Sequence, residues 1–146
     1  MITYFDTSAL LKLLVDDEMG TANVEQLWQA STIVVCAEIG YVEARAALAA
    51  ATRARRLTAA AWRAARVSLD SAWAQLEVVP VTTALVRDAA EVAESNGLRG
   101  YDAVHLAAAL IIPADTFVSG DNQLCSAAAS HNLHIANPNS PPPPAD

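Results

Sequence analysis

Four acidic residues stand where an apolar run of the chain gives way to a turn or to the start of a helix: they are Asp6, Glu43, Asp102 and Asp121. Asp6 and Asp121 each follow a run typical of a buried strand, whereas Asp102 and Glu43 lie at or near the start of alanine-rich segments. In an open α/β sheet, functional groups gather beyond the carboxyl ends of the strands. Carboxylates gathered there repel one another unless protons or cations separate them. A hard cation that prefers oxygen ligands, such as Mg²⁺, suits such a site.

Helix capping is the alternative explanation for these acids. Aspartate is a favoured N-cap, and Asp6, Asp102 and Asp121 all stand at plausible helix starts. Glu43, taken alone, is more simply a solvated helix residue. A capping aspartate, however, needs no glycine before it. Gly100 and Gly120 stand shortly before Asp102 and Asp121, and these small residues leave room beside a site.

The segments that position these acids alternate between strand-like and helix-like patterns. Strands are predicted over residues 2–5, 32–36, 76–81 and 116–119, with a possible short strand over 133–135. Helices are predicted over residues 8–15, 21–30, 39–54, 58–74, 83–96, 101–111 and 122–130. Thr58 and either Thr82 or Thr83 are expected N-caps, and Gly97 is an expected C-terminal stop. This alternation predicts an α/β fold with a central parallel sheet of four to five strands and helices on both faces.

Length and composition favour a single domain. Of the 146 residues, 53% are hydrophobic but only 5% are aromatic, so the core must consist mainly of Ala, Val and Leu. The domain is expected over residues 1–136. The tail 137–146 contains four consecutive prolines and is expected to be disordered or polyproline II. The acidic run 16–18 is expected to be a solvated loop.

The sequence favours a cytoplasmic protein that does not enter a membrane. Asp6 interrupts the N-terminal apolar stretch, unlike in a secretory signal. The longest apolar stretch, 103–112, is too short to span a bilayer. Cys36 and Cys125 lie in apolar runs and are interpreted as buried, reduced thiols.

The net charge of −7 argues at first against a nucleic-acid partner, but the basic residues are not evenly spread. Six of the nine lie between residues 44 and 69, where there is no acid. They are either a solvated helix face or a surface that binds RNA phosphates. The candidates for RNA contact are Arg53, Arg55, Arg56 and Arg63.

Four segments of the chain resemble, in order and spacing, the motifs of PIN-domain ribonucleases, and most closely those of the VapC toxins of VapBC toxin–antitoxin modules. They are FDTSAL at 5–10, EIGYVEARAAL at 38–48, YDAVHLA at 101–107 and FVSGD at 117–121. The resemblance covers about residues 1–136 and implies a PIN-like three-layer α/β/α sandwich. Many members carry a further acid shortly after the fourth motif, where this chain has Asn122 and Gln123.

The resemblance implies a metal-dependent endoribonuclease. Asp6, Glu43, Asp102 and Asp121 would form its acidic quartet, with Mg²⁺ or Mn²⁺ held by the three aspartates. The supporting hydroxyls would come from Thr7, Ser8 and Ser119. The implied partners are an RNA substrate, a small VapB-like antitoxin and a second copy of the chain in a homodimer.

The sequence predicts that His105 and the three tryptophans have structural roles. His105 shares a helix face with Asp102, at i+3, and is more readily a packed imidazole than a ligand or general base. The three tryptophans fall on apolar helix faces and are expected in the core or an interface; Trp62 lies in the arginine-rich stretch.

Two other functional classes remain open. A haloacid-dehalogenase-type phosphatase also begins with a strand that ends in Asp, but it places a second acid two residues later, where this chain has Ser8. A catalytically inactive PIN-like binding module is the stronger alternative, although it leaves four acids without a role.

Overall fold

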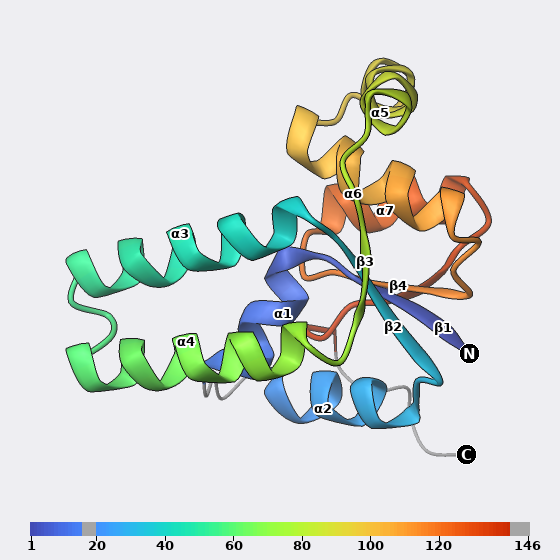
Figure 1. Ribbon diagram of the computed structural model, residues 1–146. Coiled ribbons are helices and arrows are strands. Elements are labelled where there is room, and N and C mark those ends of the chain that lie inside the picture. Colours follow the sequence, from blue (N-terminus) through green and yellow to red (C-terminus); the bar gives the residue numbers. More distant parts are fainter. Residues whose placement is uncertain (16–19, 141–146) are drawn as a thin grey trace.

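The structure, a computed structural model, describes residues 1–15 and 20–140 (Figure 1). The strands are β1 (Ile2–Phe5), β2 (Ile33–Ala37), β3 (Glu77–Val79), β4 (Thr116–Val118) and β5 (His134–Ala136). The helices are α1 (Thr7–Leu14), α2 (Thr21–Ala30), α3 (Ile39–Arg53), α4 (Ala59–Trp73), α5 (Thr83–Asn96), α6 (Gly100–Ile111) and α7 (Asn122–Ser130). The acidic run 16–18 and the four prolines of the tail lie outside the described residues.

The strands form one parallel sheet in the order β3-β2-β1-β4-β5, which confirms the predicted fold class. The central strand β1 lies between β2 and β4, with Tyr4 paired to both Val35 and Phe117. Because all strands run the same way, their carboxyl ends meet at one edge of the sheet. Asp6 and Asp121, which follow β1 and β4, are thereby brought to that edge.

Alternation of side chains along the strands produces two cores, one on each face of the sheet. Tyr4, Val35 and Phe117 point toward α5, α6 and α7, and the rings of Tyr4 and Phe117 stack 5.3 Å apart. Phe5 and Val118 point toward α1 and α2 on the other face. The three layers are visible in Figure 1.

Helices α3 and α4 form an antiparallel pair that projects away from the sheet (Figure 1). Gly40 lets the first turn of α3 pack closely against β2, since a Cβ there would lie 2.5 Å from the Sγ of Cys36. At the far end the chain turns through Arg55, whose φ is 59°. The turn between α3 and α4, which carries the exposed Arg55 and Arg56, therefore lies at the end of the pair that is distant from the sheet (Figure 1).

Most predicted helix ends are confirmed, with one correction. Thr58 and Thr82 are N-caps, and Gly97 ends α5 in the left-handed conformation. Asp102, however, is not the N-cap of α6: Arg99 occupies that position, and its extended backbone lets its carbonyl accept from Ala103 N at 3.0 Å. Asp102 lies in the first turn of α6, where its carboxylate accepts a hydrogen bond from Arg99 Nε instead of capping the helix.

Strand β3 is shorter than predicted because Pro80, which has no amide hydrogen, cannot extend an edge ladder. Of the helices in residues 1–15 and 20–140, none combines the length and apolarity needed to cross a bilayer. Both cysteines are free and buried, as predicted.

Candidate active site

Asp6 is the buried centre of the site. It caps α1, with Oδ1 accepting from Ala9 N at 3.0 Å and from Ser8 Oγ at 2.7 Å. Its Oδ2 accepts from Ser119 Oγ at 2.5 Å. Burial raises the pKa of Asp6 above its ordinary value of 3.8, although the hydroxyls of Ser119 and Ser8 oppose the shift. All these donors are neutral, so a buried carboxylate here lacks a full compensating charge.

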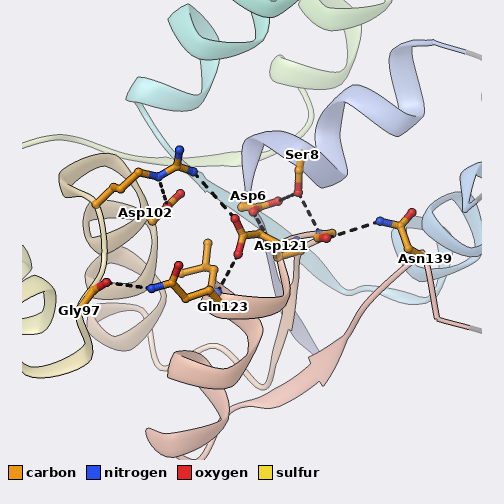
Figure 2. Close-up of polar contacts among 11 residues, drawn as sticks. Asp6, Ser8, Gly97, Asp102, Asp121, Gln123 and Asn139 are labelled. Carbon is orange, nitrogen blue, oxygen red and sulfur yellow. Dashed lines mark hydrogen bonds and ion pairs between the residues drawn. The ribbon is translucent and has the colours of Figure 1, made fainter.

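The two serines join the end of β1 to the turn after β4. Ser8 Oγ accepts from Gly120 N at 2.9 Å, and Ser119 Oγ accepts from Asp121 N at 3.0 Å. Asp121 in turn caps α7 through Leu124 N, at 2.9 Å from its Oδ1. Its second oxygen, Oδ2, is directed toward the guanidinium of Arg99 (Figure 2). Capping and a site role are therefore compatible, because each uses a different part of the carboxylate.

Asp102 and Asp121 are connected by an arginine. The Nε of Arg99 lies 3.1 Å from Asp102 Oδ2, and its NH2 lies 3.9 Å from Asp121 Oδ2 (Figure 2). The two carboxylates come from α6 and the turn before α7, so the guanidinium spans two elements. Sequence reasoning missed Arg99; its only signal was its place three residues before Asp102.

Glu43 lies beside the same edge, held by α1 and α6. Its Oε1 accepts from Thr7 Oγ1 at 2.8 Å and lies 2.6 Å from His105 Nε2. Burial acts to raise the pKa of Glu43, but the interactions with His105 and the Thr7 hydroxyl outweigh it and hold the pKa below its ordinary value of 4.5. Glu43 is therefore a carboxylate at neutral pH.

The imidazole of His105 is fixed from behind by Tyr4. Nδ1 lies 2.7 Å from the Tyr4 hydroxyl, which accepts from Ala37 N at 3.0 Å. Burial raises the pKa of Tyr4 well above 10.0, so the phenol keeps its proton and donates it to Nδ1. The other ring nitrogen, Nε2, faces Glu43 Oε1. His105 is packed, as expected, but its hydrogen bond to Glu43 was not foreseen.

The donor set fits a hard divalent cation. Asp6, Asp102 and Asp121 are carboxylates on three segments that meet at one edge, and two of them already share a cationic group, Arg99. As they stand, no three His, Cys, Asp or Glu side chains within residues 1–15 and 20–140 are arranged to hold a metal ion. The side chains of Asn122 and Gln123 point elsewhere: Asn122 accepts from Asn137 at 3.0 Å, and Gln123 donates to the Gly97 carbonyl at 2.9 Å.

A groove of about 830 Å³ leads away from the site between α1 and α3. Its inner end includes Ser8 and Gly120, and its outer end includes Arg56 and Leu57. The four arginines predicted to bind RNA are all exposed, but only Arg56 among them lines this groove. Trp28 and Trp73 pack beside the core, as predicted. Trp62 lies under the guanidinium of Arg66, whose carbon is 4.9 Å from the ring centre.

Residues 3–130 match the family model of the PIN domain. The chain belongs to the PIN-domain family. This confirms the resemblance seen in the four motifs and sets aside the phosphatase interpretation.

Individual proteins that resemble this chain in sequence or in structure agree with the assignment to the PIN-domain family. The PIN domain is 36% identical over 133 residues to Ribonuclease VapC45 of Mycobacterium tuberculosis, covering 91% of this chain and 87% of that protein. Among solved structures it resembles FitAcB from Neisseria gonorrhoeae, with a TM-score of 0.71 and 18% identity over 94% of this chain and 98% of the other. It also resembles a toxin-antitoxin complex from Klebsiella pneumoniae, with a TM-score of 0.67 and 13% identity over 93% and 97% of the two chains.

Proposed function

We propose that this PIN domain is a metal-dependent endoribonuclease and the toxin of a toxin–antitoxin pair. The observation that carries the proposal is the convergence of Asp6, Asp102 and Asp121 at the carboxyl edge of the sheet, with Glu43 beside them. The similarity to a protein named as a ribonuclease, over nearly the whole chain, supports it.

In the proposed site, Asp6, Asp102 and Asp121 hold Mg²⁺ or Mn²⁺. The bound ion would make an attacking water more acidic and neutralise the extra charge on the phosphate in the transition state. Ser8 and Ser119 fix the rotamer of Asp6, and so set where its oxygens point.

Glu43 is proposed to orient the attacking water or to hold a second ion. Its lowered pKa keeps it able to accept a proton at neutral pH, and His105 and Thr7 fix one of its oxygens while the other stays available. Attack by water on the phosphorus, with cleavage of the bond to the 3′-oxygen, would leave a 5′-phosphate and a 3′-hydroxyl, and it does not use the 2′-hydroxyl as nucleophile. The two residues that follow Asp121 are amides with structural contacts, so they supply no further carboxylate for a second ion.

The antitoxin is proposed to occupy the groove. Its walls include Leu11, Ala47, Leu48 and Ala51, which suit apolar anchors of a bound segment, and its inner end reaches Ser8 beside Asp6. An Arg or Lys at the end of that segment would reach the three aspartates and displace the metal. The similarity to a toxin from a solved toxin-antitoxin complex supports such a partner. We further propose that the toxin is a homodimer.

Mapping of the cleaved ends tests the proposed function. The purified chain is incubated with total cellular RNA and Mg²⁺, and the new ends are sequenced by a method that requires a 5′-phosphate. We expect a limited set of new 5′-phosphate ends, which also identifies the substrate. Intact RNA, together with no heat of metal binding in calorimetry, would instead indicate an inactive binding module.

A further inference from the structure

Arg99 stands at the mouth of the site in an unusual position for a surface arginine. It occupies the N-cap position of α6 but makes no side-chain cap bond. Its side chain is 82% exposed, yet it is directed at two carboxylates that are 23% and 35% exposed. The guanidinium therefore lies between the acidic site and solvent, where an RNA strand would approach.

The two ends of the guanidinium are held unequally. Nε makes a hydrogen bond to Asp102 at 3.1 Å, whereas NH2 is 3.9 Å from Asp121, too far for a hydrogen bond. A guanidinium has five N–H donors in a planar fork, and the Nε contact uses only one. Asp102 thus fixes the direction of the group without using the pair of terminal nitrogens that binds phosphate oxygens best.

Stability does not account for this arrangement. An ion pair with such an exposed partner contributes little to folding, and the i, i+3 spacing adds only a small helix-surface interaction. Placing a cation against two acids that are proposed to hold a metal also has a functional cost, because the cation and the metal compete for the same carboxylates.

We propose that Arg99 is the phosphate-binding residue of the site, an inference that rests on the proposed function. In the metal-free protein it partly neutralises Asp102 and Asp121. When the metal takes over that role, the terminal nitrogens turn to a non-bridging oxygen of an RNA phosphate while Nε stays on Asp102. Arg99 thus weakens metal binding in the absence of RNA and strengthens RNA binding in the presence of metal.

The test uses Arg99→Gln, with Arg87→Gln as matched control, since Arg87 is an exposed arginine on α5. Calorimetry measures Mn²⁺ affinity of the full chain without RNA. Binding of a short single-stranded oligoribonucleotide is measured with Mn²⁺ over a range of salt, in a Glu43→Gln background, which suppresses cutting while the three aspartates proposed to hold the metal stay intact. Arg99→Lys keeps the charge but removes the fork.

We expect Arg99→Gln to bind Mn²⁺ severalfold more tightly than wild type but to bind RNA severalfold more weakly, with a salt slope lower by about 0.7, the value for one phosphate contact on a single strand. Arg99→Lys should keep wild-type metal affinity and lose part of the RNA affinity, and Arg87→Gln should change neither. Unchanged RNA binding or an unchanged salt slope in Arg99→Gln overturns the proposal, whatever the metal affinity. If the wild-type chain binds neither Mn²⁺ nor RNA, it is the proposed function that fails.

Discussion

His105 Nε2 lies 2.6 Å from Glu43 Oε1, and this contact links the interior of the sheet to the edge where the acids meet. The two residues are 62 positions apart, on α6 and α3. Behind His105, the Tyr4 hydroxyl and the Ala37 amide complete a chain of hydrogen bonds that starts at β2. Glu43 is therefore positioned by the core, although it lies on a helix that projects from the sheet.

The first prediction concerns this contact. His105→Phe keeps a ring but removes both nitrogens, so Glu43 loses a donor and the Tyr4 hydroxyl loses its acceptor. We expect kcat to fall at least tenfold with KM little changed, and unfolding free energy to fall by about 1–3 kcal/mol for the buried hydroxyl left unpaired. Steady-state cleavage kinetics and urea unfolding measure the two effects.

A double-mutant cycle separates positioning from general damage. If His105 acts through Glu43, His105→Phe should have little further effect on kcat in a Glu43→Gln background. Additive losses in the double variant would show that His105 does not act on the reaction by way of Glu43.

The second prediction concerns Asp6. Asp6→Asn keeps a good N-cap but removes a buried charge, so the metal-free protein should be at least as stable as wild type while cleavage is lost. Asp6→Ala also removes the cap and should lose about 1 kcal/mol. Thermal melting in EDTA compares the three proteins. An active Asp6→Asn variant, with only Asp6→Ala destabilised, would favour a capping role alone; the same comparison applies to Asp121→Asn and Asp121→Ala, since Asp121 caps α7.

The stability difference between Asp6→Asn and wild type should change with pH in one direction. Because the folded pKa of Asp6 is raised, the folded state binds its proton more tightly than the unfolded state. The free energy of unfolding of wild type should therefore fall as pH rises from 3.8, the ordinary pKa, to the raised pKa of the folded state. Above the folded pKa, Asp6 contributes no further change with pH. In EDTA, the advantage of Asp6→Asn over wild type should grow across that window. An advantage that is independent of pH would mean that the folded pKa is not raised.

Much of the fold was predictable because it depends on short-range patterns. Thr58 and Asp121 cap helices through amides three residues away, and the strand positions follow from β-branched runs. The order of strands and the partners of His105 depend on contacts between distant segments: Tyr4 and His105 are 101 residues apart. Arg99 was missed for the same reason, since its ion pair with Asp121 depends on how α6 and α7 approach.

The third prediction concerns the exposed arginines of α3 and α4. If they bind phosphates, Arg53→Glu combined with Arg63→Glu should weaken RNA binding and lower the salt slope by about 0.7 for each lost contact. Arg87→Glu on α5 controls for the change in net charge. An unchanged affinity and slope would assign this surface to solvent, a dimer contact or the antitoxin.

The fourth prediction concerns the groove. Ala51→Trp should fill part of the groove wall and reduce capture of the proposed antitoxin, which is sought in the neighbouring reading frame by co-expression and pull-down. Changing the basic C-terminal residue proposed for that antitoxin to Ala or Glu should release the toxin from inhibition. Inhibition that survives that change would show that the antitoxin acts without a cation in the acidic site.

The last prediction is that cleavage depends on a divalent metal held by the acids. The measurement is cleavage of one defined RNA substrate by wild type and by Asp6→Asn, Asp102→Asn and Asp121→Asn, purified identically, in Mg²⁺, in excess EDTA and after Mg²⁺ is restored. The metal site predicts that wild type cuts only with free Mg²⁺, recovers when Mg²⁺ is restored, and that all three variants are inactive. Cleavage by wild type in excess EDTA, absent from a mock preparation, would contradict it.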